Sequence, residues 1–306
     1  ADLYEELKRG YSLDHLKEDI LELIKPKKPT QAIAEYELES WLDSSIRTNG
    51  QNRFEAYKKL LNIQDKASII PQMDADTYKI LDSCYNPNEL SEEWDRRGLV
   101  YGHVQSGKTA NYIGLINRAF DSGYSIVIVL TGMTKDLRSQ TQRRIDEGVI
   151  GQRGGQQLGI GEIDFFQKLP KVMPATTLSD DLSRSNRDLI GSNFSVKEKS
   201  IWVIKKNKTV LENLILWLDR QRSNSTNDKI NYVPFLVIDD EADNASIQSM
   251  SKKDYESWGE GQKLADLDNE ELTEKQKEAL KKAQERVIKA INRNIRVALS
   301  LMAHKT

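Results

Sequence analysis

Cysteine and histidine are scarce in this sequence. Its 306 residues contain a single cysteine, Cys84, and three histidines that lie far apart, His15, His103 and His304. A disulfide framework needs paired cysteines, and a structural zinc site needs cysteines or histidines at short spacings. The sequence therefore excludes small disulfide-stabilised and zinc-ligated domains, and the single cysteine predicts a reducing, cytoplasmic location.

Long apolar runs and an excess of one charge are also absent. No run of about 18 apolar residues occurs, so we expect neither a membrane span nor a membrane partner. The 45 Lys and Arg residues nearly balance the 47 Asp and Glu residues, which excludes a uniformly basic nucleic-acid wrapper. Any affinity for DNA must then come from a local patch or from parts outside this sequence. A chain of this length can bury a sizeable core and is expected to form about two domains.

Three apolar stripes with helical spacing predict a helical accessory region over residues 1–97. The stripes consist of Leu38, Trp41, Leu42 and Ile46, of Phe54, Tyr57, Leu60 and Leu61, and of Ile80, Leu81 and Cys84. The first stripe predicts a helix over 30–46, and the third predicts a short helix that begins near Asp74 or Asp76 and ends before Pro87. We interpret all three stripes as core packing rather than as ligand sites.

From residue 98 onward, apolar runs that are typical of buried strands alternate with helical segments. The predicted strands cover 99–101, 125–131, 201–204 and 235–238, and the predicted helices run from residue 108 to Gly123 and over 135–147, 210–218 and 291–301. The stretch 148–161 contains six glycines and predicts a loop, and 252–289 predicts a solvated helical face. This alternation predicts an α/β fold, in which a parallel sheet carries helices on both faces.

A glycine-rich motif follows the first of these strands. It matches the pattern G-x-x-x-x-G-K-[ST] with Gly102, His103, Val104, Gln105, Ser106, Gly107, Lys108 and Thr109. Glycines at this spacing let successive backbone N–H groups point at one anion, and the following helix adds its positive N-terminal end. Lys108 is expected to reach the β- and γ-phosphates of ATP, and the Thr109 hydroxyl to ligate Mg²⁺. We therefore predict that these eight residues bind a nucleotide.

Acidic residues follow the last predicted strand, at Asp239, Asp240 and Glu241. A phosphoryl-transfer ATPase needs one carboxylate for Mg²⁺ and another that orients or deprotonates the attacking water. In D-E-A-D register, Asp240 holds the metal together with Thr109, and Glu241 activates the water. Lys108, Asp240 and Glu241 are therefore the predicted catalytic residues. Asp239 stands where such motifs usually carry an apolar residue, which leaves open which aspartate serves the metal.

The two motifs together resemble the first motor domain of a superfamily-two helicase or translocase, which has the RecA-like fold. More specifically, the chain resembles the Z-one domain family of endonuclease-associated P-loop ATPases over most of residues 75–300. The matching segments are 98–151, IWVIKKNK at 201–208 and VIDDEADNAS at 237–246. Gln105 and the stretches 131–132 and 137–142 match beyond a generic phosphate loop.

This resemblance implies a bacterial, ATP-dependent, helicase-like hydrolase with ATP and Mg²⁺ as cofactors. The implied partners are DNA and the proteins of restriction-modification or phage-defence systems. Residues 131–142 would correspond to motor segments that approach the DNA backbone. Lys205, Lys206 and Lys208 either add positive charge there or belong to an ordinary solvated loop.

The family continues into a second motor domain that carries arginine fingers, whereas this sequence stops at Thr306. We therefore expect residues 98–306 to be the first RecA-like ATPase domain of a longer protein. An arginine supplied by another domain accelerates related ATPases by orders of magnitude. The isolated chain is accordingly expected to bind ATP, to hydrolyse it slowly and not to translocate.

Other functions remain open from the sequence. A nucleotide-gated interaction module would bind ATP and change its contacts with a partner without moving along DNA. A metabolic nucleotide kinase would need an arginine-rich lid, which the sequence does not show convincingly. A nuclease would need clustered carboxylates and a lysine, for which Glu162, Asp164 and Lys168 are the nearest match. Trp94 is either a contact for the adenine base or a packing residue.

Overall fold

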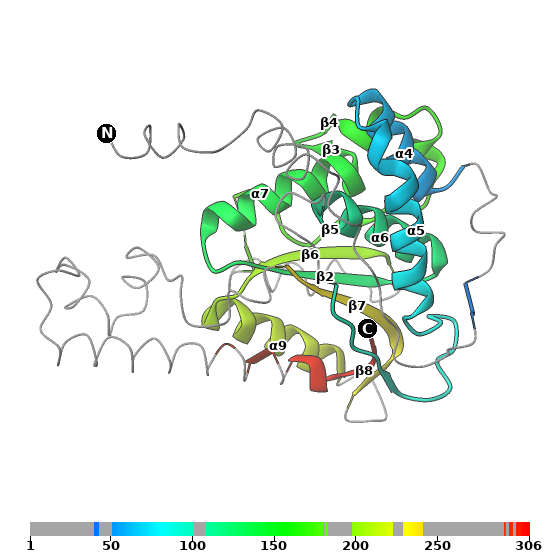
Figure 1. Cartoon of the computed structure of the whole chain (residues 1–306). Helices are drawn as coiled ribbons and strands as arrows, with labels where there is room; N and C mark the ends of the chain where they lie inside the picture. Colours follow the sequence, from blue (N-terminus) through cyan, green and yellow to red (C-terminus); the bar gives the residue numbers. More distant parts are fainter. Residues whose placement is uncertain are drawn as a thin grey trace, which may run out of the picture.

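The computed structural model contains a six-stranded sheet in which all neighbouring strands run parallel (Figure 1). The strand order is β1-β8-β7-β2-β6-β5. The strands are β1 (Trp94–Asp95), β2 (Ile126–Thr131), β5 (Met173–Pro174), β6 (Ser200–Lys205), β7 (Ile230–Asp239) and β8 (Met302–Lys305). The structure describes residues 40–42, 51–100, 108–179, 181–182, 198–222, 229–240, 291, 294–295 and 298–306, with the backbone alone at 303 and 304.

Helices cover both faces of this sheet. They are α4 (Arg53–Ile63), α5 (Ile70–Asp82), α6 (Lys108–Ser122), α7 (Lys135–Ile145) and α9 (Lys208–Arg222), and residues 291, 294–295 and 298–300 are also helical. Short 3-10 turns occur at Ala67–Ile69, Gly159–Glu162 and Phe166–Lys168. Within the residues that the structure describes, no helix has the length and apolar character needed to cross a membrane.

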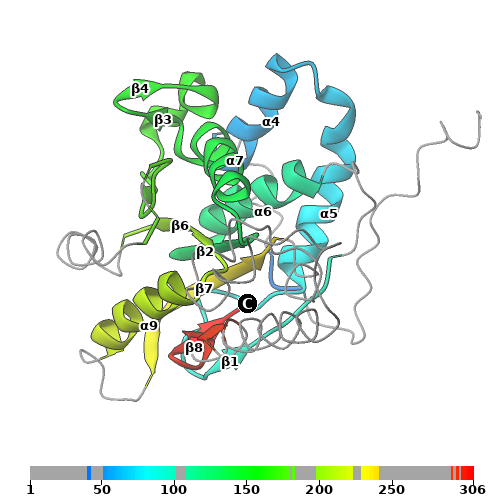
Figure 2. The same ribbon diagram turned by 90° about the vertical axis from the view of Figure 1, so that its left-hand side faces the viewer.

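Two layers of helices lie on opposite sides of the sheet (Figure 2), and alternate residues of β2 belong to the two cores beneath them. Val127 and Val129 point into a core formed with α4, α5 and α6, whereas Ile128 and Leu130 point into a core formed with α9 and the helical residues Ile291 and Ala298. A strand turns successive side chains to opposite faces, so a sheet that is covered on both faces requires an unbroken apolar run. The predicted α/β fold, with helices on both faces of a parallel sheet, is confirmed.

Helices α4 and α5 share a core with α6 and the sheet. Asp121, in the last turn of α6, accepts the backbone N–H groups of Arg53 (3.1 Å) and Phe54 (2.9 Å), which have no partner within α4 because they begin it. Phe54 is buried and reaches Gly114 of α6, where its ring would lie 3.3 Å from an added Cβ. Within the predicted accessory region, residues 1–97, helices α4 and α5 therefore belong to one helical layer of the α/β fold, and β1 belongs to the sheet, so the described part of this region is not wholly helical.

The helix predicted over 30–46 differs from the structure at residues 40–42, which are irregular. The backbone N–H groups of Trp41 and Leu42 donate to Asp82 Oδ1, at 3.2 and 3.1 Å. In a helix interior these groups would instead donate to backbone carbonyls. The rest of that predicted helix, and the charged segment 252–289, lie outside the described residues.

Helix α5 begins at Ile70 instead of near Asp74, because Pro71 occupies its first turn. Proline is favoured there, since its missing N–H has no partner within the helix. The helix ends at Asp82, before the proline that was expected to stop it. Cys84, which follows it, is buried, and its thiol donates to the Ile80 carbonyl at 3.1 Å.

The prediction of a strand over 99–101 is wrong at Leu99 and Val100, the two of these residues that the structure describes. Leu99 and Val100 form no strand, and they are 83% and 47% exposed. The edge strand β1 lies earlier, and its ladder with β8 ends where the Arg96 N–H donates to the Lys305 carbonyl at 3.1 Å. A strand extends only as far as a neighbour pairs with its backbone, and an apolar pattern within one segment does not reveal that limit.

The other predicted elements are confirmed with altered boundaries. Helix α6 ends just before Gly123, whose φ of 114° is a conformation that favours glycine. Strands β2 and β6 and helices α7 and α9 contain most or all of the segments predicted for them. Strand β7 is longer than the predicted 235–238, and its pairing with β8 is irregular between Ile230 and Pro234. Proline has no N–H to donate to a neighbouring strand, which accounts for this irregularity.

The glycine-rich stretch 148–161 is more ordered than the predicted loop. It includes most of a π-helical turn (Asp146–Ile150) and a hairpin of β3 (Gln152–Arg153) and β4 (Gln156–Gln157). The turn closes at Gly151, which has a φ of 78° and donates its N–H to the Asp146 carbonyl at 2.7 Å. The backbones of Gly151 and Gly161 then meet so closely that a Cβ on Gly161 would lie 1.9 Å from the Gly151 carbonyl oxygen.

We expect Gly161→Ala to lower the free energy of unfolding by about 2 kcal/mol, because the added methyl group must displace the backbone of Gly151. Urea denaturation measures this change. Gly98→Ala is the matched control, since nothing lies within 4 Å of a Cβ there, and it should change stability by less than about 0.5 kcal/mol. Equal urea midpoints for the two variants would contradict the close backbone contact.

Candidate functional site

The candidate site lies at the carboxyl ends of β2 and β7. The two strands pair in register from Ile126 opposite Phe235 to Leu130 opposite Asp239, and the Asp240 N–H then donates to the Leu130 carbonyl at 2.9 Å. The chain leaves β2 toward α7 on one face, whereas the helical residues that precede β8 pack on the other face. In open α/β sheets, ligands bind at the carboxyl edge where neighbouring connections diverge in this way.

The end of the phosphate-binding motif begins helix α6. Lys108 is the first residue of this 15-residue helix and is exposed. Thr109 follows it, and its Oγ1 accepts a hydrogen bond from Arg144 Nη1 of α7 at 3.1 Å. The remaining motif residues, 102–107, lie outside the described residues, so the prediction that they bind phosphate stays a prediction.

Tyr112 shares helix α6 with Thr109, and its pKa responds to the charge of Asp240 at the end of β7. It lies one helical turn after Thr109 and is buried. The pKa of Tyr112 is raised to about 12, chiefly by burial and also by the negative charge of Asp240, while Arg144 and Thr141 act in the opposite direction. The charges of the Asp240 carboxylate and the Arg144 guanidinium thus both shift the pKa of this phenol, in opposite directions. Thr109 thus lies one turn before this phenol in α6, and Asp240 acts on the phenol through its charge.

Asp239 has a different partner from Asp240. Its Oδ1 lies 2.5 Å from Nζ of Lys206, whose side chain is only 1% exposed. A buried ammonium group requires a neutralising partner, because the cost of removing an isolated charge from water is large. Asp239 is thus engaged by Lys206. Glu241, the predicted base, lies outside the described residues.

Half of the stretch expected to approach DNA, residues 131–142, is buried. In α7, Arg138, Thr141 and Gln142 are buried, and the exposed side chains include Arg143 and Arg144. Of Lys205, Lys206 and Lys208, Lys206 is buried against Asp239 and is therefore not part of a surface patch. Lys208 is exposed, and its Nζ lies 3.9 Å from Glu212 Oε1.

Other candidate residues lie away from this neighbourhood. Trp94 is buried and stacks on Tyr85, with ring centroids 5.1 Å apart, which confirms its packing role. Among the described residues, no group of three or more His, Cys, Asp or Glu side chains is arranged to hold a metal ion. Glu162, Asp164 and Lys168, the carboxylates and lysine considered for a nuclease, are exposed.

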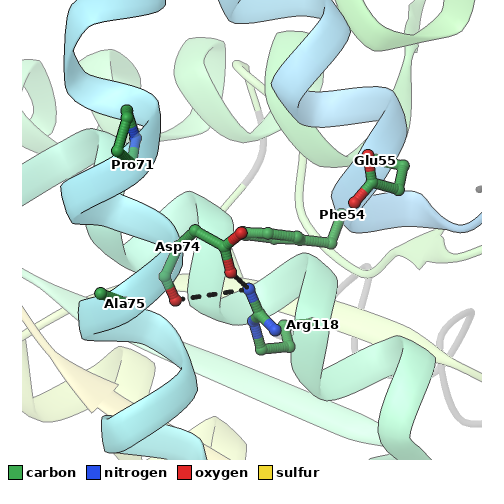
Figure 3. Close-up of a pocket in the computed structure, with 6 residues that line it drawn as sticks. All are labelled: Phe54, Glu55, Pro71, Asp74, Ala75 and Arg118. Carbon is green, nitrogen blue, oxygen red and sulfur yellow. Dashed lines mark hydrogen bonds and ion pairs between the residues drawn. The ribbon is translucent and has the colours of Figure 1, made fainter. Parts of the chain in front are cut away.

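A cavity of about 270 Å³ opens between α4, α5 and α6 (Figure 3). Its charged wall consists of Arg118, which is ion-paired with Asp74 at 2.5 Å and lies over the ring of Phe54, 3.8 Å from its centroid. Arg118 is ten residues beyond Lys108 in α6, which places it roughly 15 Å along the helix from the start of that helix. The cavity is therefore separate from the candidate site, and its cation is already neutralised.

Sequence reasoning missed Tyr112 and Arg144. Tyr112 has a weak signal, since a residue three positions after Thr109 shares its helix face. The sequence contains no signal for Arg144, because this residue lies in another helix and its contact with Thr109 depends on how α7 packs beside α6. Comparisons with protein-family models, with curated proteins and with solved structures found no match.

Proposed function

We propose that this chain binds ATP with Mg²⁺ and hydrolyses it, as the first RecA-like, helicase-like motor domain of a bacterial DNA restriction or phage-defence protein. The observation that carries the proposal is that Lys108 and Thr109 begin α6, while Asp240 follows the carboxyl end of β7 and its N–H donates to the Leu130 carbonyl at 2.9 Å. These residues come from two motifs that are far apart in the sequence. The resemblance to the Z-one domain family supports the choice of ATP hydrolysis over other uses of a nucleotide.

The described residues have the chemistry that Mg²⁺ and a polyphosphate require. Mg²⁺ prefers hard oxygen ligands, and the Thr109 hydroxyl and the Asp240 carboxylate are oxygen donors. A helix N-terminus and an exposed ammonium favour phosphate oxygens, and Lys108 supplies both at the start of α6. The donor set therefore fits a metal–nucleotide complex.

The roles of the residues follow from their chemistry. A bound Mg²⁺ ion would neutralise part of the negative charge on the β- and γ-phosphates. Thr109 and Asp240 would hold it, and Lys108 would donate hydrogen bonds to phosphate oxygens. Glu241 would orient the attacking water and accept its proton. The buried pair of Lys206 and Asp239 supports the end of β7 from which Asp240 extends.

One observation favours a second candidate function. Burial of Arg138, Gln142 and Lys206 removes three polar side chains from the surface expected to contact DNA. A nucleotide-gated interaction module needs the same ATP site but no such surface. The second candidate is therefore a module that changes its contacts with a partner protein when ATP binds.

Nucleotide titration and steady-state hydrolysis of the full-length parent protein test these proposals. We expect ATP binding that requires Mg²⁺ and a rate of hydrolysis that rises when single-stranded or duplex DNA is added at low salt. Binding with a rate that DNA leaves unchanged from low to high salt would eliminate the motor function and leave the interaction module. Absence of ATP binding would overturn both.

A further inference from the structure

Arg144 holds an unusual position for an exposed arginine. It lies in the last turn of α7, and its Nη1 donates across to Thr109 Oγ1 in the first turn of α6, at 3.1 Å. Its guanidinium also acts on the phenol of Tyr112, on which the charge of Asp240 acts as well. An arginine thus reaches, from the neighbouring helix, the hydroxyl that the proposed function assigns to the metal.

This contact competes with a metal ion on the same hydroxyl. A threonine hydroxyl has two acceptor lone pairs and one proton, and the hydrogen bond from Arg144 uses one of those lone pairs. A divalent cation on the other would stand only a few ångströms from the guanidinium, and like charges at that distance repel. Phosphate oxygens relieve the repulsion, because a guanidinium binds them through paired, charge-assisted hydrogen bonds.

We propose that Arg144 is a phosphate-binding residue that distinguishes ATP from ADP, exchanging its hydrogen bond with Thr109 for the terminal phosphate when ATP binds. The inference rests on the proposed function, since it assumes a nucleotide at the phosphate-binding motif. The β- and γ-phosphates share the metal that Thr109 ligates in such sites, so the terminal phosphate is the group that comes within reach of Arg144. Arg144 is therefore an arginine supplied within this chain, independent of any arginine from a second motor domain.

Arg143 provides a matched control for this proposal. It is the neighbouring residue in the last turn of α7, its side chain is exposed, and it carries the same charge near the same helix end. Replacement of either arginine removes one favourable interaction with the helix dipole. Only Arg144 reaches Thr109.

The test measures the affinities for ATP and ADP, each with Mg²⁺, by calorimetric titration of the parent protein and its variants. We expect Arg144→Ala to weaken ATP binding about tenfold and ADP binding less than twofold, as the loss of one charge-assisted contact predicts. The ATP affinity of Arg144→Lys should lie between those of the wild type and Arg144→Ala, because lysine keeps the charge but cannot form the paired hydrogen bonds of a guanidinium. Arg143→Ala should match the wild type for both nucleotides.

Two outcomes would overturn the proposal while leaving the proposed function intact. One is wild-type ATP affinity in Arg144→Ala, and the other is an equal loss of ATP and ADP affinity in that variant. Failure of the wild-type protein to bind either nucleotide would instead refute the proposed function itself. Thermal unfolding checks the fold, and the melting temperature of Arg144→Ala should equal that of Arg143→Ala within about 2 °C, since both side chains are exposed.

Discussion

Replacement of Lys108 by alanine is expected to weaken ATP binding by about 10- to 100-fold. A hydrogen bond to a charged group contributes about 1.5–3 kcal/mol, and Lys108 would form such bonds with the β- and γ-phosphates. The fold should survive, because the side chain is exposed at the first position of α6 and alanine is a good helix former. Affinity and stability are therefore expected to separate in this variant.

Fluorescence titration with a labelled ATP analogue measures the affinity, and thermal unfolding measures the stability. Lys79→Ala is a suitable control, since Lys79 is exposed in α5 and lies in a different helix from the candidate site. That variant should bind the analogue like the wild type. Undiminished binding by Lys108→Ala would contradict the assignment of residues 102–109 as the nucleotide site.

Replacement of Arg138 by alanine should destabilise the protein by about 3–5 kcal/mol, the typical effect of breaking a buried ion pair. Arg138 is 1% exposed, and its Nη2 donates to the carbonyls of Thr177 (2.7 Å) and Leu178 (3.0 Å). Its Nε lies 3.8 Å from Asp181, a carboxyl group whose pKa is raised by burial and lowered by Arg138. The substitution removes this cation and takes a hydrogen-bond partner from each of the two carbonyls.

Urea denaturation followed by circular dichroism measures the effect of Arg138→Ala. Gln140→Ala is the control from the same helix, because Gln140 is exposed, and its free energy of unfolding should stay within about 0.5 kcal/mol of the wild type. A loss of less than about 1 kcal/mol in Arg138→Ala would mean that Arg138 is a surface residue, as the expected DNA-facing role for 131–142 requires.

Much of the fold was predictable from local patterns. The apolar run 125–131 predicted a strand buried on both faces, and all six residues of β2 are buried. The stripe at Phe54 and Tyr57 predicted a helix, and both residues are buried in α4. Such predictions succeed because the period of apolar residues along the chain follows from the geometry of a single element.

The failures have a common cause, which is dependence on a distant partner. Leu99 and Val100 have a strand-like composition but lie past the end of the β1–β8 ladder. Lys206 reads as a surface lysine, yet it is buried against Asp239, because β6 and β7 lie on either side of β2. Neither outcome is contained in the residues around the position concerned.

The sequence by itself determined the alternation of strands and helices in the α/β fold, and it placed Lys108 and Thr109 at the start of a helix and Asp240 just beyond a buried strand. These features depend on residue period and on motifs of a few neighbouring residues. Only the tertiary structure decided that Asp239 neutralises Lys206 and that Arg144 donates to Thr109. The physical reason is that such contacts join segments far apart in the chain, whose distances are set by the packing of helices on the sheet.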